Sequence, residues 1–575
     1  MGRQSSLMKR NSTYTGDHGP HKYAFTTRSE KPEMVLGISS GTDERGAIGV
    51  PDLNGGEEDY TNWEPGKEEW WIIGNLSLVS LVVALDATIL VSALPAISYA
   101  LHGSANVTFW SATSYLLASA IILPFASSLS DIFGRRSSLL ASILLFTAGT
   151  IIIVASQGFT QLLIGRCVQG IGGGGIMALV QVIYTDIVPL RQRAKYMALI
   201  HVTWSFGSIA GPLIGGLIVL KASWRWLFYI NFPILAASLV VTVWTVRFDM
   251  ERTTWREKLR RVDWLGGAIF VPSITAFLVA VTWGGWQYSW GSWQAVVPLL
   301  MGALGIVATF VYEKWGVKEP FIRPMVFQDR STSSALACAF LQGMVLHGQL
   351  YYIPFFFESV KGYNSLLAGI SIFPIAFTTI PAGALVGVLI SRTGRFLWAV
   401  WGGFAVLTLG ACLLIFLDST IEAFNWILIF LVIGLGHGFL ISPLNIAVQT
   451  SCDTQDAPFA VSMFMFMRTL GTCVGIAMGS SVVQNSLAVQ LSKAGLPLGV
   501  ASDATAFILE LWKMPVNSEL HLKFVSAYAG SFHSLFEVAA GLVLLGGVIS
   551  LLIEPYSIDK KLDSGHVLRK EEAGV

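Results

Sequence analysis

The chain has 575 residues, of which 53% are hydrophobic and 13% are charged, and its mean hydropathy is +0.61. Soluble proteins carry about 25% charged residues, so these values exclude an ordinary soluble domain. The net charge of +1 gives no indication of a nucleic-acid partner. The five cysteines are scattered and show no metal-site spacing, so we expect neither a bound metal nor a disulfide framework.

Residues 1–69 form a polar segment that is rich in Gly, Ser, Lys and Glu and lacks apolar periodicity. We expect this segment to be a disordered cytosolic tail without a cleavable signal peptide. The first apolar segment then has to act as the internal targeting signal.

Fourteen segments are long and apolar enough to cross a bilayer core of about 30 Å as helices. Lys and Arg gather in the short connections on the side of the amino terminus, which predicts that both termini are cytosolic. The segments centre near residues 72–94, 109–129, 138–156, 161–184, 198–220, 227–246, 264–284, 295–314, 334–356, 367–390, 397–416, 426–449, 459–483 and 533–553.

A charged motif between two apolar segments recurs about half the chain apart, as SSLSDIFGRR at 127–136 and GVLISRTGR at 387–395. The spacing WxxGxxxG that starts at Trp204 likewise recurs as RxxGxxxG from Arg468. Internal repeats of this kind are typical of secondary transporters. We therefore predict two related six-helix bundles, with two further helices inserted between them.

The predicted fold is an all-α integral membrane protein with fourteen transmembrane helices. The expected parts are a first bundle at 70–247, an insert with flanking cytosolic loops at 248–330, a second bundle at 331–554, a long extracellular loop near 484–531 and a cytosolic tail at 555–575.

Asp86 and Arg166 fall inside predicted spans of the first bundle. Charged groups at membrane depth are costly unless they are paired or hydrated, and they are usually functional. We expect Asp86 to carry a coupled proton and Arg166, which stays charged, to control its release, with Asp86 as the candidate partner. The alternatives are a structural hydrogen bond from Asp86 to Thr88 or to a neighbouring helix, and a packing role for Arg166.

Asp131, Gly134 and Arg135 lie in the first copy of the charged motif, and Asp186 lies near the neighbouring cytosolic connection. Such a cluster can hold one side of a transporter shut and release it during transport. The alternative is that the basic residues only set the topology. In the second copy Ser391 replaces the acid, so we expect the full charge lock only in the first bundle.

The segment GSIAGPLIGG offers small side chains for close helix packing and a proline that kinks a helix. We expect it to form a packed hinge. The hinge candidates are Gly207, Gly211, Pro212, Gly215 and Gly216. No nucleotide-binding motif accompanies the glycine run at 172–175. We therefore expect no cofactor, with a proton gradient as the energy source.

Arg468 and Glu537 are further charges in or near predicted spans. His347 and His437 also lie in apolar spans, where we interpret them as packing residues rather than proton relays. Asn106 begins a glycosylation sequon on a predicted outward loop, which would make the protein a glycoprotein.

Several of these segments together resemble the major facilitator superfamily, in particular its fourteen-span drug:proton antiporters and their fungal multidrug and toxin efflux pumps. The segments that carry the resemblance include LDATILVSALPAI, SLSDIFGRR, RCVQGIGGGG and GSIAGPLIGG. The resemblance implies that Asp131 and Arg135 belong to a conformational lock and that Arg166 takes part in proton coupling. It also implies that Pro212 and its neighbouring glycines form a hinge associated with export.

We therefore expect a non-enzymatic, proton-coupled exporter of small hydrophobic organic molecules, such as a fungal secondary metabolite, toxin or drug. We expect a monomeric multi-pass protein of the cell membrane, whose partners are its small-molecule substrate, protons and the lipid bilayer. The alternatives are a vacuolar importer of basic amino acids, in the vacuolar membrane, and a sensor that binds a solute without transporting it.

Overall fold

The computed structural model describes residues 63–560, apart from 91–92, 102–104, 247–253, 286, 318, 503 and 517. Most of the expected amino-terminal tail and residues 561–575 of the expected carboxyl-terminal tail therefore lie outside the described residues. By its contacts the chain separates into Met1–Glu58, which is also outside them, and the unit Asp59–Val575.

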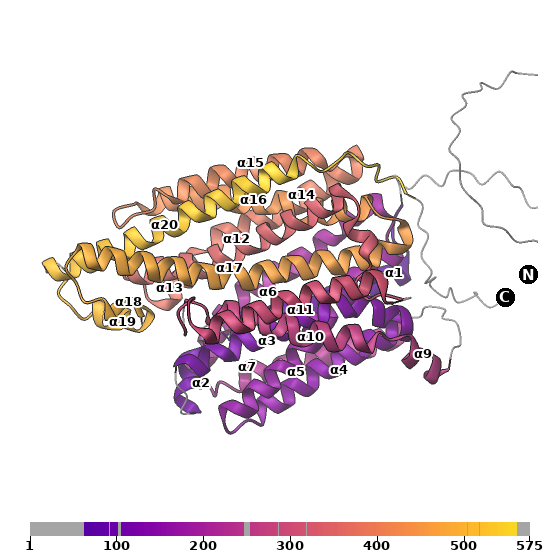
Figure 1. Cartoon of the computed structure of the whole chain (residues 1–575), viewed down its shortest axis with the longest axis horizontal. Coiled ribbons are helices and arrows are strands. Elements are labelled where there is room, and N and C mark those ends of the chain that lie inside the picture. The colour runs from indigo at the N-terminus through magenta and orange to yellow at the C-terminus, as the bar shows by residue number, and fades with distance from the viewer. Residues whose placement is uncertain are drawn as a thin grey trace, which may run out of the picture. The chain divides into compact units, whose positions relative to one another are not determined.

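The second unit is built from long α-helices that lie side by side (Figure 1). The first bundle contains α1 (Lys67–Ile89), α3 (Ala105–Phe133), α4 (Arg135–Val154), α5 (Phe159–Ile187), α6 (Leu190–Lys221) and α8 (Asn231–Thr245). The second contains α12 (Arg330–Val360), α14 (Phe373–Thr393), α15 (Leu397–Leu414), α16 (Ala423–Thr450), α17 (Ala457–Lys493) and α20 (Glu519–Ser550). We call the side at which α1 begins and α20 ends the termini side, and the opposite side the far side.

Short helices complete the connections between the long ones. They are α2 (Leu94–Ala100), α7 (Trp226–Tyr229), α13 (Ser365–Ser371), α18 (Gly499–Ser502), α19 (Ala504–Leu511) and the 3-10 turns η3 (Pro324–Phe327) and η4 (Thr454–Asp456). The far-side connection after α17 is more helical than expected. α17 continues to Lys493 and α20 already begins at Glu519, so both ends of the expected loop at 484–531 are helical, while its extracellular position stays a prediction.

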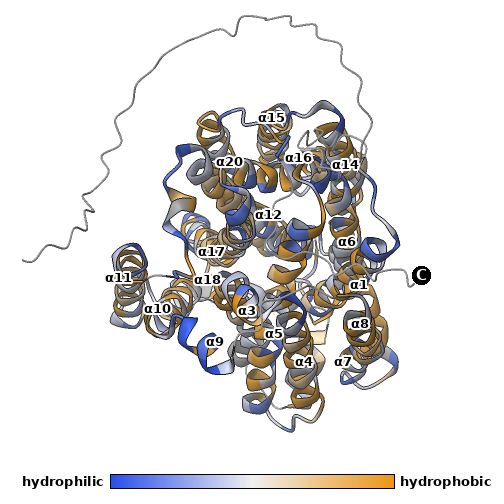
Figure 2. Cartoon of the chain, turned by 90° about the vertical axis from the view of Figure 1, so that its right-hand side faces the viewer, coloured by the Kyte–Doolittle hydropathy of each residue, from blue (hydrophilic) through white to orange (hydrophobic). Residues whose placement is uncertain are grey.

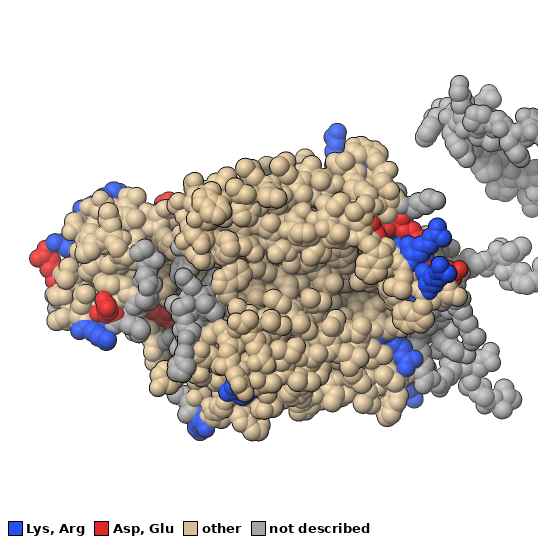
Figure 3. All heavy atoms as spheres, turned by 60° about the horizontal axis from the view of Figure 1, so that its bottom comes forward, with Lys and Arg blue, Asp and Glu red and all other residues tan. Residues whose placement is uncertain are grey.

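Thirteen helices in the described part of the chain are long and apolar enough to cross a membrane. The remaining expected span corresponds to α12, whose 31 residues suffice in length but include the polar residues Gln342, His347 and Gln349. Hydropathy therefore does not confirm the count of fourteen. In Figure 3 the charged side chains gather toward the two ends of the helices, and the surface between them is almost free of Lys, Arg, Asp and Glu.

Both bundles contain pairs of helices that pack closely at a glycine residue. A Cβ atom at Gly170 of α5 would lie 2.5 Å from the Tyr115 carbonyl oxygen on α3, and one at Gly434 of α16 would lie 2.3 Å from the Ile375 carbonyl oxygen on α14. These approaches are too short for any side chain larger than hydrogen. The second bundle therefore uses the same kind of glycine contact in an equivalent pair of helices.

The crossing of α1 with α6 is matched by the crossing of α12 with α17. A Cβ atom at Gly211 would lie 2.1 Å from the Thr88 hydroxyl oxygen, and one at Gly475 would lie 2.2 Å from the Met344 carbonyl oxygen. Gly475 is the residue that the sequence repeat pairs with Gly211. Thr88 of α1 therefore corresponds to Met344 of α12, and the two halves share one helical plan.

The insert consists of α9 (Trp255–Arg261), α10 (Trp264–Trp283) and α11 (Trp293–Trp315). The α10 and α11 helices pack mainly on each other and lie at one edge of the unit (Figure 2). Phe270 of α10 contacts the rings of Phe125 on α3 and Phe466 on α17. The insert therefore covers the seam between the bundles on that edge.

Candidate functional site

α1 and α5 bring Asp86 and Arg166 together inside the first bundle. Nη1 of Arg166 lies 2.6 Å from Oδ2 of Asp86, and the two side chains are 1% and 0% exposed. The partner that we expected for Arg166 is in contact with it. The alternative partner, Thr88, instead donates its hydroxyl proton to the Ala84 carbonyl at 3.0 Å. Neutralising only one member of a buried ion pair is costly, because the other charge then stays buried without a partner.

Polar groups from other helices complete the coordination of this ion pair. Oδ1 of Asp86 accepts hydrogen bonds from Gln169 Nε2 at 2.9 Å and from Asn231 Nδ2 at 3.1 Å. Nε of Arg166 donates to the Ser111 carbonyl at 2.9 Å. The site therefore joins α1, α3, α5 and α8. A change in the charge of Asp86 alters the contacts among these four helices.

The four residues expected to form a lock do meet at the termini side of the first bundle. Gly134 adopts φ 97°, a left-handed conformation that favours glycine, and so turns the chain from α3 into α4. Arg135 follows at once, pairs with Asp131 and places Nε 2.7 Å from Oδ2 of Asp186. The Ser130 hydroxyl also accepts from Arg135. The guanidinium thus ties α3, α4 and α5 together, while its role as a lock stays a prediction.

Hydrogen bonds that join the two bundles cluster on the termini side. Ser391, in the second copy of the motif, donates to Gln192 Oε1 at 2.6 Å. Nη1 of Arg193 donates to Gln449 Oε1 at 2.6 Å, and Asn445 Nδ2 donates to Gln181 Oε1 at 3.2 Å. Ser391, which stands where the first copy of the motif has Asp131, therefore forms a hydrogen bond to the opposite bundle. This side of the seam is closed in the structure.

Two of the hinge candidates allow close packing of α6 on α1. A Cβ atom at Gly207 would lie 2.7 Å from the Ala84 Cβ, and one at Gly211 would meet the Thr88 hydroxyl, whereas Gly216 has open space around it. The α6 helix runs without a break from Leu190 to Lys221. The close approach is thus a property of the structure, and hinge motion stays a prediction.

The other candidates have less defined surroundings. Gly215 is buried, and the side chain of Pro212 lies outside the described atoms. Asn106 belongs to the first turn of α3, where its side chain is likewise outside the described atoms, so glycosylation stays a prediction. Glu537 is exposed on α20 and contacts no other member of these clusters.

A second polar cluster, which the sequence did not reveal as a unit, lies between α12, α16 and α17. Nε of Arg468 donates to Gln342 Oε1 at 3.1 Å. Gln342 Nε2 lies 3.4 Å from His437 Nδ1, and His437 Nε2 lies 2.9 Å from Gln349 Oε1. His437 therefore has a hydrogen-bond partner at each ring nitrogen, and its interpretation as a packing residue rather than a proton relay stays a prediction.

The residues that were missed in this cluster are the two glutamines and Thr472. Gln342 and Gln349 stand seven residues apart and therefore share one face of α12. Two buried amides on one face of a span were a usable signal. Thr472 could not have been found in this way, because its hydroxyl contacts His347 Nδ1 at 3.0 Å only through the packing of α17 on α12.

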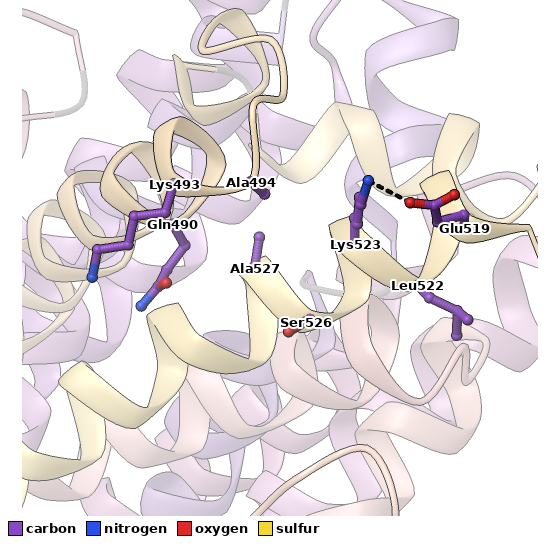
Figure 4. Close-up of a pocket in the computed structure, with 8 residues that line it drawn as sticks. All are labelled: Gln490, Lys493, Ala494, Glu519, Leu522, Lys523, Ser526 and Ala527. Carbon is purple, nitrogen blue, oxygen red and sulfur yellow. Dashed lines mark ion pairs between the residues drawn. The ribbon is translucent and has the colours of Figure 1, made fainter.

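The pocket drawn in Figure 4 lies outside both clusters, between the far-side ends of α17 and α20. Its polar lining includes Gln490, Lys493, Lys523 and Glu519, and Lys523 pairs with Glu519 at 2.6 Å. These helix ends extend past the other helices in Figure 1. The pocket is therefore a surface feature and not part of the path through the bundles. Among the described residues, no group of His, Cys, Asp and Glu has the arrangement of a metal site.

Comparison with known proteins agrees with the fold and the motifs. Residues 76–476 match the sequence profile described as Major Facilitator Superfamily. The chain is 38% identical over 493 residues to "MFS transporter L2" of Phoma sp., covering 85% of this chain and 82% of the relative. It is 35% identical over 415 residues to "MFS efflux transporter aclA" of Aspergillus oryzae, covering 72% and 75%. It is 29% identical over 523 residues to "Efflux pump FUS6" of Gibberella fujikuroi, covering 88% and 94%.

Solved structures show the same fold at low sequence identity. The human organic anion transporter MFSD10 (TETRAN) superimposes with a TM-score of 0.57 at 15% identity, covering 84% of this chain and all of that one. The proton:xylose symporter XylE superimposes with a TM-score of 0.54 at 12% identity, covering 85% and 97%. The resemblance expected from the motifs is confirmed, and the chain belongs to the major facilitator superfamily, among its fungal efflux pumps.

Proposed function

We propose that the chain is a proton-coupled exporter of small, largely apolar organic molecules that works by alternating access. The observation that carries this proposal is the buried ion pair between Asp86 and Arg166. Relatives named as efflux pumps support the direction of transport. A relative of Aspergillus aculeatus, 31% identical over 533 residues, is named "Acurin A biosynthesis cluster MFS-type transporter", which supports a fungal secondary metabolite as cargo.

In this proposal Asp86 exchanges a proton with water when the bundles expose it. Protonation removes the negative charge that balances Arg166, so the neutral carboxyl group loses its strongest attraction to the guanidinium. The hydrogen bonds that Gln169 and Asn231 donate to Oδ1 become weaker as well, because the acceptor is then a neutral carboxyl oxygen instead of a carboxylate oxygen. Since the pair joins four helices, the proton state of Asp86 biases the relative position of those helices.

The closed termini side is the cytosolic side in this proposal, in agreement with the Lys and Arg distribution. Opening toward the cytosol requires the bonds from Ser391 to Gln192 and from Arg193 to Gln449 to break. The Arg135 cluster with Asp131 and Asp186 holds the adjacent helix ends in place and would have to reorganise in the same step. The structure then corresponds to the stage in which the cytosolic entrance is shut.

The most direct test of export is deletion of the gene in its own host, followed by mass spectrometry of cells and medium. We expect at least one low-molecular-weight compound to disappear from the medium and accumulate in the cells, and reintroduction of the gene to reverse this. A fluorescent carboxyl-terminal fusion should mark the cell membrane. Unchanged partition of all detected compounds between cells and medium would contradict the export function.

The vacuolar amino-acid alternative has less support from the site. A transporter of basic amino acids needs acidic groups that meet the cationic side chain, but Asp86 is neutralised by Arg166. The second cluster contains a cation, Arg468, rather than an acid. A fusion protein on the vacuolar membrane, with lysine or arginine uptake into vacuoles, would instead favour this alternative.

A further inference from the structure

We propose that Arg468 and the polar chain that starts at its guanidinium bind an acidic group, such as a carboxylate or an acidic enol, on the transported molecule. This inference rests on the proposed transport function and adds the charge of the cargo to it.

Arg468 lies deep in the membrane and close to the seam between the bundles. At about 1.5 Å per residue, it is about 16 Å along α17 from its start at Ala457. His201 is at the same depth along α6 of the first bundle, which begins at Leu190, and α17 itself packs against α3 and α5 of that bundle. Solute sites of transporters built from repeats lie near the membrane midplane, where the repeats meet.

The positive charge of Arg468 has no protein counter-charge among the described residues. No carboxylate there lies within salt-bridge distance of the guanidinium, and Gln342 is its only side-chain hydrogen-bond acceptor. The register that pairs Thr88 with Met344 also pairs Asp86 with Gln342. The second bundle thus carries an amide at the position where the first has its acid. An arginine at membrane depth without an anion is costly, and an anionic ligand removes this cost.

The hydrogen bonds of the cluster run in one direction, away from Arg468. The Arg468 Nε can only donate, so Gln342 Oε1 accepts and Gln342 Nε2 must donate to His437 Nδ1. His437 Nε2 then donates to Gln349 Oε1. This order requires a neutral His437 that carries its proton on Nε2. It ends at Gln349 Nε2, which is a further donor rather than an acceptor.

The donor that ends this series of hydrogen bonds is buried and has no partner among the residues that the structure describes. Gln349 is 4% exposed, and its Nε2 atom makes no hydrogen bond within the described part of the chain. It borders a small cavity between α12, α17 and α20 whose other lining residues are apolar. Unsatisfied buried polar groups are rare in proteins, so Gln349 Nε2 is available to a hydrogen-bond acceptor that enters this cavity.

Binding of two probes of equal shape to the purified chain in lipid nanodiscs tests this site. The probes are 2-naphthoate, which is an anion at pH 7, and 2-naphthamide, which is neutral. We expect the wild type to prefer 2-naphthoate. The Arg468→Gln variant should lose at least about tenfold in affinity for 2-naphthoate, because charge-assisted hydrogen bonds are lost, and should bind 2-naphthamide as the wild type does.

Three further variants separate the site from general effects on folding. Arg468→Lys keeps the charge and should retain part of the preference for 2-naphthoate, while Gln349→Leu should weaken the binding of 2-naphthoate alone. Arg261→Gln removes the same charge at an exposed position that pairs with Glu319 and should change neither affinity. Each variant is first checked for folding by size-exclusion chromatography. If Arg468→Gln does not fold, the affinities of Arg468→Lys and Gln349→Leu for 2-naphthoate test the site instead.

Equal binding of the two probes by the wild type, or unchanged 2-naphthoate binding in both Arg468→Gln and Gln349→Leu, would overturn the proposal. Complete loss of 2-naphthoate binding when gluconate is replaced by chloride would do so too, since the site would then serve a small inorganic anion. If the site fails in these ways while gene deletion still traps a compound in the cells, the export function stands and only the anionic character of the cargo is wrong.

Discussion

Arg166 and Asp86 form an almost fully buried ion pair, with 2.6 Å between Nη1 and Oδ2. Asp86→Asn should leave the guanidinium of Arg166 without its counter-charge and destabilise the protein by about 3–5 kcal/mol. The double variant Asp86→Asn/Arg166→Gln should regain part of this loss, because no charge then remains buried. Unfolding of the single and double variants in lipid nanodiscs forms a mutant cycle that measures the coupling of the pair.

A matched control for the ion pair is Glu537→Gln. It removes a carboxylate from another long helix, but Glu537 is exposed there, so the midpoint of unfolding should stay within the error of the wild type. Additive effects of the two substitutions at Asp86 and Arg166 would show that the pair contributes no coupling energy, contrary to our account.

Gly211→Ala and Gly216→Ala test the close crossing of α1 and α6. A methyl group at Gly211 would lie 2.1 Å from the Thr88 hydroxyl oxygen and 3.0 Å from the Ile89 backbone nitrogen, whereas Gly216 has no atom within 4 Å. We expect Gly211→Ala to cost about 1–3 kcal/mol through overpacking, and Gly216→Ala to be neutral or stabilising by up to about 1 kcal/mol. Thermal unfolding measures both, and equal effects would refute the packing argument.

The closed termini side depends in part on the bond from Arg193 to Gln449. Gln449→Ala removes the acceptor of a hydrogen bond from a buried cation. Such a bond to a charged group contributes about 1.5–3 kcal/mol to the free energy of the state in which it forms. The population with an open termini side should therefore rise by about tenfold or more. Spin labels at Ser137 and Thr393, in a background without the native cysteines, report this population as longer distances in double electron–electron resonance.

The control for this measurement is Gln484→Ala, which removes a glutamine of α17 whose side chain, among the described residues, bonds only within its own helix, to Ser480. It should leave the distance distribution between the labels unchanged. An unaltered distribution in Gln449→Ala would show that this bond does not hold the termini side shut.

The stability of the protein should depend on pH through Asp418, which lies in the far-side connection between α15 and α16. Partial burial raises the pKa of its carboxyl group, but hydrogen bonds from Thr420 and Ile421 outweigh this effect and lower the pKa below 3.8. A lowered pKa stabilises the folded state above the unfolded pKa, and this contribution is lost as the pH falls through the folded value. Asp418→Asn should therefore destabilise the protein at pH 7, and its difference from the wild type should shrink below about pH 4.

The stability measurement for Asp418 uses the midpoint of thermal unfolding at both pH values. Asp559→Asn is a suitable control, because Asp559 is half-exposed and pairs with Arg191 at the opposite side. A difference between Asp418→Asn and the wild type that stays constant from pH 7 to pH 3 would contradict the assignment.

The helical plan was predictable from the sequence because each span has to satisfy its own backbone hydrogen bonds in the membrane. The repeated charged motif also led to the correspondence of Gly134 with Gly394, and both adopt a positive φ, 97° and 68°. The connection after α17 was not predictable in the same way. Polar residues near its ends concealed that the two helices continue beyond the apolar segments.

For the candidate site, the sequence indicated which charges were costly but not how they were satisfied. Asp86 and Arg166 could be paired from the sequence, because each supplies the counter-charge that the other needs at membrane depth. Arg468 had no such partner in the sequence, and the chain through Gln342 and His437 exists only because α12, α16 and α17 pack together. Neutral amides and imidazoles leave no charge pattern, so only their geometry reveals the cluster.

Transport driven by a proton gradient in proteoliposomes tests the central claim most directly, with the compound that gene deletion traps in the cells as substrate. For the wild type we predict accumulation of this compound only when a pH difference is imposed, and proton movement in the opposite direction. The folded double variant Asp86→Asn/Arg166→Gln should still exchange labelled for unlabelled compound but should lose the response to the pH difference. Undiminished proton-driven accumulation by that variant would contradict the role of this ion pair in coupling.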